Sequence, residues 1–586
     1  MSAAAAASVL PLPVVIPLGG AVAAPLLARL HRRLPLIVSL LTMLGSTTVL
    51  CVIAVHVYSG HGELLSHFFG RWGPIDGRAL GIAFAADPFG LAFALSSAAI
   101  GLLLLASALS ELGDLGPREL GGLACLFQLL LAALIGSALT ADTINLFVWF
   151  EVAALASYGL TGFFLERPIA LEATFKMLVL TSIAGFAVFV GSAMLYSEHG
   201  ALNFGQLANT LNGHITATDL LAVSLLIAGF ATKAGAVPFH AWLPDAHCAP
   251  PGAVSALFSA LMVNLGIVGL VRVVLQVFDA GGAGHAFLGL LMGIGVVSAV
   301  LGALLALAQD DLKRLLAWDT VSQMGILLIG FATASPDGVA GATYHLINHA
   351  LFKALLFLCA GMVVHSTGET KLSRMGGLAR HRPLVTVAFL VGSLAIAGVP
   401  PMNGYASLGL IHGSLLDSGQ FGLLAATLIA QVITIAALAR AAYLGFLRRR
   451  AEPYEHLEPS RMGMRVTLST LGTACVAFGI LPGLVIRHVA GPAASIVLHP
   501  RSYAAGVLAG HAEVPAASVH FAYANGFDIA IAALTLALGL ALAAGYLRAP
   551  EPAPIRLLRA AHTGSVNDYA AFVAVGMLVV YTVLRA

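Results

Sequence analysis

The stretch GFATKAGAVPFHAWLPDAH, residues 229–247, begins as an apolar helix and then presents a lysine, Lys233, five residues before Pro238. A proline has no backbone N–H and so interrupts a helix that reaches it. A charged side chain at the centre of a bilayer costs about 3 kcal/mol or more, and such residues usually mark the path of an ion or proton. The stretch therefore predicts a broken membrane helix that carries a buried charge.

The composition of the whole chain predicts an integral membrane protein. Of 586 residues, 59% are hydrophobic and 10% charged, and no soluble domain can bury so much apolar surface. The formal net charge is +2 and no long basic run occurs, so nucleic acid is not an expected partner. The five cysteines are widely spaced without a C-x-x-C pair, which argues against an iron–sulfur cluster, a zinc knuckle or a disulfide framework. We expect no cofactor and no covalent catalytic site in this chain.

Segments long enough to cross a bilayer recur along the chain. A membrane helix needs about 20 apolar residues, and this rule predicts an all-α polytopic membrane fold of about sixteen spans. The longer loops 59–86 and 490–525 are predicted to be folded or mobile segments outside the membrane. The predicted span cores are residues 9–29, 35–58, 87–110, 120–140, 143–165, 170–196, 219–241, 252–277, 285–308, 313–333, 339–365, 384–415, 420–447, 465–489, 526–547 and 569–585.

The distribution of basic residues predicts the orientation in the membrane. Loops after even-numbered spans hold few basic residues, namely Arg71, Arg78 and Arg501. Because positive loops face the cytoplasm, both termini are predicted to be extracytoplasmic in a bacterial cell (inner) membrane. The basic residues that follow odd-numbered spans are Arg32, Arg33, Arg118, Arg167, Lys313, Arg314, Lys371, Arg374, Arg380, Arg382, Arg448, Arg449, Arg450, Arg548, Arg556 and Arg559.

Lysine is rare in this chain, yet three lysines fall inside predicted spans. Of 29 basic side chains only five are lysine, and Lys176, Lys233 and Lys353 lie at membrane depth. Lysine changes its proton affinity readily when it is desolvated, whereas arginine stays protonated. Each lysine alone is also compatible with a snorkelling or salt-bridged structural role, but the three together favour a proton path.

Acidic and histidine residues in three spans are candidate partners for these lysines. Glu151 stands alone in the apolar fifth span, and Glu172 precedes Lys176 by one helical turn, which is also the spacing of a surface salt bridge. In YHLINHALFKALLFL, the residues His345, His349 and Lys353 recur every four positions and share one helix face. Two histidines at this spacing can bind zinc, but no further ligand is near in sequence, and a row for proton transfer fits better.

Two proline-containing breaks suggest an internal repeat. GAVPF (235–239) interrupts the seventh span and GVPPM (398–402) interrupts the twelfth. A broken membrane helix is tolerated where its freed carbonyl groups line a polar cavity. Paired broken helices are typical of transporters with internal repeats. The offset of five spans is odd, so the sequence predicts that the two repeats are inverted relative to each other.

At this point the chain resembles a known family, the antiporter-like membrane subunits of respiratory complex I, of multi-subunit cation/proton antiporters and of group 4 membrane-bound hydrogenases. The resemblance covers roughly residues 80–450. It implies fourteen core helices with two inverted five-helix repeats, spans 4–8 and 9–13, in agreement with the offset of the two breaks. The matching stretches are WFEVAALASY around Glu151, TKAGAVPFHAWLPDAH, APPGAVSAL (249–257), DLKRLLAWDTVSQMG (311–325), HLINHALFKALLFL (345–358) and AGVPPMNG (397–404).

The resemblance also implies roles for particular residues. Glu151 and Lys233 match a pair in which the glutamate modulates the proton affinity of the lysine, and the eleventh-span row matches a polar row of the family. The family's basic residue of span eight is replaced here by Ser259 and Asn264, and its span-twelve residue by Leu408. The input half looks intact, whereas the output half is altered.

A nearby histidine is a candidate for the missing output residue. His412 follows Leu408 by four positions in ASLGLIHGSL, about 6 Å along the same helix face. A neutral imidazole costs less to bury than an ammonium and relays protons at physiological pH. The alternative is that His412 lies near the outer interface and only bonds a neighbouring helix.

These observations predict a proton-translocating, antiporter-like subunit of a multi-subunit bacterial complex, with other membrane subunits as partners. Glu151, Lys233, His345, His349, Lys353, Lys176 and His412 are the candidate proton-transfer residues. Any assignment to NADH-quinone oxidoreductase activity comes through the complex. Sodium/proton antiport, inorganic-carbon uptake and a non-conducting structural subunit remain as alternatives. The predicted units are 1–118 (helices 1–3), 119–280 (helices 4–8), 281–450 (helices 9–13) and 451–586 (helices 14–16).

Overall fold

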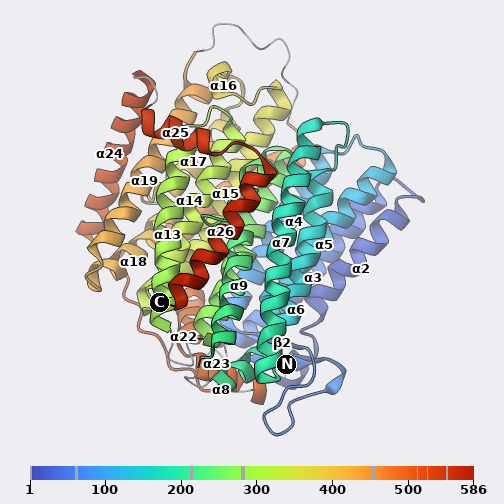
Figure 1. Ribbon diagram of the computed structural model, residues 1–586. Helices are drawn as coiled ribbons and strands as arrows, with labels where there is room; N and C mark the ends of the chain where they lie inside the picture. Colours follow the sequence, from blue (N-terminus) through green and yellow to red (C-terminus); the bar gives the residue numbers. More distant parts are fainter. Residues whose placement is uncertain are drawn as a thin grey trace.

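A bundle of long helices makes up nearly all of the molecule (Figure 1). The computed structural model describes every residue except 1–2, 60–63, 212–214, 279–283, 450–453, 455–456, 458–459, 511, 524, 549–551 and 586. Arg450, Ala586 and the predicted unit boundaries at 280/281 and 450/451 therefore fall at least partly outside the described residues.

Within the described residues, fifteen helices are long and apolar enough to cross a membrane. The twelfth predicted span is an interrupted helix whose two halves are each shorter than a full span. The prediction of about sixteen spans in an all-α polytopic membrane protein is therefore confirmed. The two inverted repeats and the four sequence units stay predictions.

The first half of the chain contains the first eight spans and a small two-stranded sheet. Its eighth span, Gly252–Phe278, is built from α11, Gly252–Leu257, and α12, Val263–Leu270, with π-helical turns after each. The other elements are α1 (Ala3–Ser8), α2 (Leu12–Leu27), α3 (Leu34–Ser59), β1 (Leu65–Phe68), β2 (Ala83–Ala86), α4 (Pro88–Glu111), α5 (Pro117–Leu139), α6 (Thr143–Thr161), α7 (Pro168–His199), α8 (Phe204–Leu211), α9 (Ala217–Ala234) and α10 (Leu243–Cys248).

The second half continues the bundle. The helix α19 is extended by a π-helical segment, Ala442–Leu447. The helices are α13 (Gly284–Leu307), α14 (Leu312–Ala332), α15 (Pro336–Thr367), α16 (Leu378–His381), α17 (Pro383–Ile396), α18 (Asn403–Asp417), α19 (Phe421–Ala441), α20 (Met462–Ile480), α21 (Pro482–Val485), α22 (Gly491–Leu498), α23 (Pro500–Ala509), α24 (Gly526–Arg548), α25 (Ala553–Ala561) and α26 (Val566–Arg585).

The seventh and twelfth spans are broken where the prolines predict. The helix α9 ends because Gly235 adopts a left-handed backbone with φ +70°, which glycine tolerates without a steric cost. The side chain of Trp242 then donates a hydrogen bond of 2.7 Å to the freed carbonyl oxygen of Thr232. Gly398, with φ +66°, plays the same part between α17 and α18. Both breaks leave polar backbone groups inside the bundle, in agreement with the prediction.

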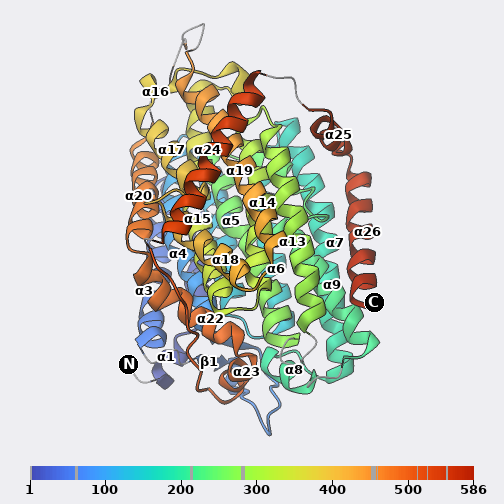
Figure 2. The ribbon, with the colours of Figure 1, turned by 90° about the vertical axis from the view of Figure 1, so that its left-hand side faces the viewer.

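The eighth span, α14 and α15 form the centre of the bundle, and the C-terminal helices form its rim. The apolar windows of the eighth span and of α14 are 100% buried, whereas those of α24 and α26 are 22% buried. Figure 2 shows α24 on the near side of the bundle and α26 at its right-hand edge, and α26 packs against α9 and α7. The titratable row predicted in α15 therefore lies in the most protected part of the molecule.

The end of the bundle where both chain termini lie is covered by short elements (Figures 1 and 2). The strands β1 and β2 pair antiparallel there, and α8 packs against α23. The fourteenth predicted span was placed at 465–489, but α20 ends at Ile480 because Pro482 follows and begins a separate helix. The predicted loop 490–525 contains α22 and α23 and is therefore folded over this part of its length.

A buried ion pair connects the third span to the eighth. The guanidinium of Arg272 binds both carboxylate oxygens of Asp87, at 2.7 and 2.6 Å, and both side chains are fully buried. Asp87 also caps the first turn of α4 by accepting from the backbone N–H of Gly90. Such a bidentate pair fixes the relative position of two helices as well as their charges.

Candidate functional site, a buried row of titratable side chains

Lys233 lies in the last turn of α9, directly before the break, and is fully buried. Its ammonium makes no hydrogen bond within the described chain and stands 4.9 Å from the centre of the Phe150 ring. The C-terminal end of a helix carries partial negative charge, and an aromatic face also attracts a cation. These two weak attractions, rather than a direct ion pair, surround the charge.

Glu151 follows Phe150 on α6 and interacts electrostatically with Lys233. Its carboxylate rests against Gly185 of α7, where an added Cβ would lie 1.8 Å from Oε1. The two side chains form no hydrogen bond or ion pair among the described residues. The structure thus holds the two members of the predicted pair near each other without contact.

Lys353 is paired with an acid that the sequence reasoning did not select. Its ammonium donates to Asp319 Oδ2 at 2.5 Å and to the carbonyl oxygen of Leu316 at 2.9 Å. Thr434 donates to the other carboxylate oxygen of Asp319 at 3.2 Å, and both charged side chains are fully buried. Asp319 is the single acidic residue in α14, which was the signal available in the sequence.

His345 joins three helices through its two ring nitrogens. Nε2 lies 3.0 Å from Gln323 Oε1 of α14, and Nδ1 lies 3.0 Å from the hydroxyl of Ser407 of α18. An amide oxygen only accepts, so Nε2 carries the proton and Nδ1 accepts from the hydroxyl. Both ring nitrogens of His345 are thus within hydrogen-bonding distance of a polar side chain, one on each neighbouring helix.

Two further buried histidines have no hydrogen-bond partner on either ring nitrogen within the described chain. One is His349, one turn after His345, and the other is His247 of α10, which the sequence reasoning passed over. The His247 ring lies 5.9 Å from that of Phe357 on α15 and interacts electrostatically with Lys353 and His349. His247 thus connects the broken seventh span to the row on α15.

The residues that replace the family's span-eight and span-twelve charges are engaged in packing. Ser259 makes a hydroxyl hydrogen bond of 2.7 Å with Thr320 of α14, and Asn264 donates to the carbonyl oxygen of Ala260 one turn earlier. Leu408 fills the break in the twelfth span, where a Cβ on Gly398 would lie 2.9 Å from its methyl group.

His412 is buried in α18, and its Nε2 makes no hydrogen bond within the described part of the chain. It interacts electrostatically with His345. The residues His345, His349 and Lys353 on α15, His247 on α10 and His412 on α18 therefore belong to one buried row. Among the described residues, no group of three or more metal-ligating side chains stands together, so a zinc site on His345 and His349 would lack further ligands.

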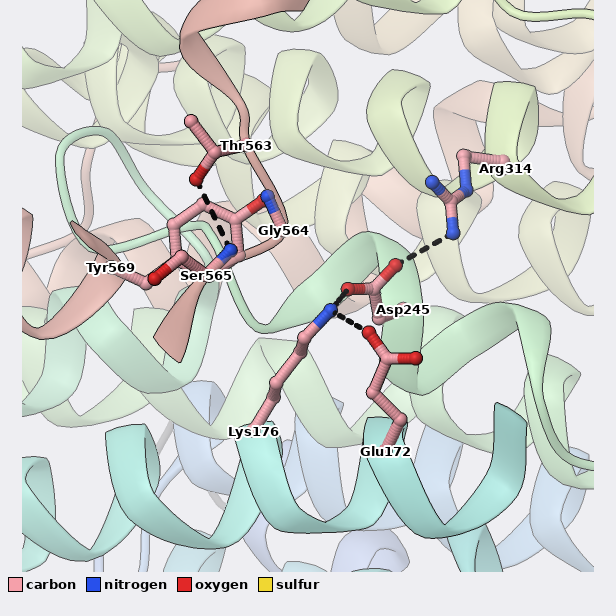
Figure 3. Close-up of polar contacts among 8 residues, drawn as sticks. All are labelled: Glu172, Lys176, Asp245, Arg314, Thr563, Gly564, Ser565 and Tyr569. Carbon is pink, nitrogen blue, oxygen red and sulfur yellow. Dashed lines mark hydrogen bonds and ion pairs between the residues drawn. The ribbon is translucent and has the colours of Figure 1, made fainter. Parts of the chain in front are cut away.

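Lys176 belongs to a different cluster. Its ammonium contacts Glu172 at 2.5 Å and Asp245 of α10 at 2.9 Å, and Arg314 binds the other oxygen of Asp245 at 2.7 Å (Figure 3). Gly564, in the turn before α26, covers the ammonium. The i,i+4 pair with Glu172 exists as predicted, but Lys176 contacts neither Glu151 nor Lys233.

The turn that covers Lys176 is anchored by a second contact. His562 lies with its Nε2 3.0 Å from that of His240, next to the break in the seventh span, and both rings pack on Trp318. Because α10 carries both Asp245 and His247, this helix joins the Lys176 cluster to the buried row.

Comparison with known proteins identifies relatives of the chain. Residues 140–434 match the family model described as NADH:quinone oxidoreductase/Mrp antiporter, TM. The chain is 30% identical, over 81% of its length and 96% of the relative, to a membrane subunit, designated N, of the NADH-quinone oxidoreductase of Desulforudis audaxviator. It is 32% identical, over 64% of its length and 74% of the relative, to one of the Na+/H+ antiporter subunits of Alkalihalophilus pseudofirmus.

A solved structure has the same fold. A chain of an archaeal respiratory membrane complex, the membrane-bound sulfane sulfur reductase, superimposes with a TM-score of 0.79 at 27% identity. The match covers 85% of the present chain and 100% of the archaeal one.

Proposed function

The chain belongs to the NADH:quinone oxidoreductase/Mrp antiporter transmembrane family, and from this premise we propose that it conducts protons along its buried row of titratable side chains. It is an antiporter-like, multi-pass membrane subunit of a multi-subunit complex, with other membrane subunits as partners. The path we propose runs from Glu151 and Lys233 through His247 to the α15 row and then to His412.

The observation that carries the proposal is the set of buried nitrogens without protein partners. The ammonium of Lys233 and the two ring nitrogens of His247 and of His349 form no hydrogen bond within the described chain. Leaving a buried polar group unsatisfied costs about 1–3 kcal/mol, and three such side chains lie along this one path. A proton relay needs such free lone pairs, because each site must accept a proton before it passes one on.

The Glu151–Lys233 pair supplies the loading step. The charges of the two side chains attract each other although the groups are not in contact. In a medium of low dielectric constant, a small movement of the carboxylate therefore changes this attraction strongly. Approach of the carboxylate favours the ammonium form of Lys233, and withdrawal favours release of its proton. The released proton passes to the imidazole of His247, directly or over water, and the lysine is left as a neutral amine.

The chemistry of the row favours protons over sodium as the conducted ion. Hard cations prefer carboxylate, carbonyl and water oxygens as ligands. Beyond Glu151 at its start, the path consists of imidazole and ammonium nitrogens with one paired acid, Asp319, whose charge is already compensated by Lys353. Sodium or inorganic-carbon coupling, if present in the complex, therefore takes place at other residues than these.

His247 offers a direct test of the connection between the two halves. We expect His247→Phe to lower proton transport about tenfold, because a relay water replaces the imidazole only in part. His247→Gln, which keeps polar atoms but cannot carry a proton, should be impaired to a similar extent. Transport is measured as dye-reported acidification of inverted vesicles that contain the assembled complex, with complex content determined in parallel.

A matched control for this experiment is His240→Phe, because His240 is also buried near the seventh-span break but faces His562. We expect it to retain most of the transport. Transport at the wild-type rate by both His247 variants would contradict the proposed connection and favour the non-conducting alternative.

We propose that the end of the bundle with the termini is extracytoplasmic. The basic loop that contains α16 and the short helix α25 lie at the opposite end (Figures 1 and 2), as the charge distribution requires. We expect a reporter fused after residue 375 to score as cytoplasmic and one fused after residue 586 to score as external. The reverse pattern would contradict the orientation.

A further inference from the structure

A small cavity lies beside His412, between the broken twelfth span and two neighbouring helices. Its volume is about 10 Å³, which is the space of about one water molecule. Its walls come from α18, from α19 and from the first turns of α24. Among the lining residues, only His412 belongs to the proposed proton path.

Besides Tyr405, whose hydroxyl donates to the carbonyl oxygen of Tyr523 at 3.2 Å, three polar side chains line the cavity. His412 Nε2 and Gln431 Oε1 are both buried and make no hydrogen bond within the described chain. The amide nitrogen of Gln431 donates to the carbonyl oxygen of Ala397 at 2.8 Å, which fixes the orientation of its oxygen. The third side chain is Asp528 of α24, whose carboxylate lies close to Gly409 of α18. Two to four polar partners are what a buried water needs.

Asp528 is unusual for its position. It is the single acidic residue of α24, an apolar helix whose outer surface is mostly exposed on the rim of the bundle. An acid in the first turn of a helix is stabilised by the helix dipole, which would explain a carboxylate with no function. That explanation does not account for the two buried, unpartnered atoms of α18 and α19 that line the same cavity.

We propose that His412, Gln431 and Asp528 hold one water molecule and that Asp528 receives the proton at the output end of the path. This inference rests on the proposed function. A proton arriving at Nδ1 of His412 makes the imidazolium, which gives its Nε2 proton to the water. The water passes one proton to the Asp528 carboxylate, and the neutral imidazole, the water and a neutral carboxyl group remain. Release of that proton to the solvent restores the carboxylate.

The cavity suits a water better than a metal cation. A sodium ion requires several oxygen ligands, and the cavity offers Gln431, Asp528 and the already bonded hydroxyl of Tyr405 beside one ring nitrogen, in a space of about 10 Å³. The loss of the family's span-twelve charge at Leu408 is thereby explained, because the charge of the output site has moved to the fifteenth span.

The test compares substitutions at Asp528 in vesicles that contain the intact complex. We expect Asp528→Asn to lower proton transport about tenfold, which is less than the full value of a positioned acid or base because solvent is near. Asp528→Glu should retain most of the transport. Asp417→Asn removes an exposed carboxylate at the end of α18 and serves as the matched control that should transport normally. Infrared difference spectra should show a carboxyl C=O band that disappears in Asp528→Asn.

A second variant fills the cavity without changing any polar residue. Ala532 lines the cavity and Ala533 faces outward, so Ala532→Leu should lower transport and Ala533→Leu should not. Wild-type transport by Asp528→Asn, or by Ala532→Leu if the asparagine variant does not assemble, would overturn the inference. If Lys233→Ala also transports normally, the whole proposed path is wrong; if Lys233→Ala is inactive, only the output site is wrong.

Discussion

Lys233→Ala should abolish proton transport in an assembled complex, with a loss of about 100-fold or more, because positioned proton-transfer groups contribute at least that factor. In the proposed path Lys233 is the residue that Glu151 loads, and no hydrogen bond of the described chain depends on its ammonium. Its removal should therefore leave the bundle intact. Lys233→Arg should fail as well, because a guanidinium stays protonated and cannot release its proton.

The measurement is proton uptake by inverted vesicles, normalised to the amount of assembled complex. Lys371→Ala removes an exposed lysine and is the matched control, which should transport like the wild type. Glu151→Gln should give a smaller loss than Lys233→Ala, since it removes the control of the lysine but keeps the lysine. Normal transport by Lys233→Arg would show that a fixed charge is sufficient, in favour of a structural role.

Substitutions in the Lys353–Asp319 pair should affect the stability of the fold and proton transport differently. Removing one partner leaves an uncompensated buried charge, so Lys353→Met or Asp319→Leu alone should destabilise the fold by about 3–5 kcal/mol. Removing both should restore stability, because well-packed apolar residues often replace a buried ion pair at no cost. Transport should remain absent in the double variant, since the row then lacks Lys353, the ammonium group between its histidines and Asp319.

Stability is measured by thermal unfolding of the purified complex and transport by the vesicle assay. The chain provides a matched control in its other buried pair, Asp87–Arg272, which lies outside the row. The double variant Asp87→Leu with Arg272→Met should recover stability except for the lost cap of α4, worth about 1 kcal/mol, and should keep transport. Recovery of transport in the Lys353→Met, Asp319→Leu double variant would contradict a role of this pair in the path.

The sequence was sufficient for features that depend on local patterns. Runs of apolar residues predicted the spans, and the prolines and glycines near Pro238 and Gly398 predicted both breaks. The four-residue spacing from His345 to Lys353 predicted a common face, because one helix carries all three residues. The end of the fourteenth span was predicted too far along, since the apolar run continues beyond Ile480 although Pro482 begins a new helix.

Features that depend on contacts between distant helices were not accessible in the same way. Asp319 on α14 pairs with Lys353 on α15, and the local sequence of neither span predicts this contact. His247 was overlooked because its surroundings come from the eighth and eleventh spans as well as its own. Lys176 was grouped with the path, whereas its contact with Asp245 places it in a separate ion cluster.

The central claim is that this chain conducts protons, and the most direct measurement is proton flux through the wild-type complex. The complex, purified from its own membrane through a tag on this chain, is reconstituted in sodium-free proteoliposomes, and a potassium diffusion potential is imposed. We predict a proton flux that is reported by an internal pH dye and is lost when the complex carries Lys233→Ala. An intact wild-type complex that shows no flux above that of the Lys233→Ala complex would contradict the account.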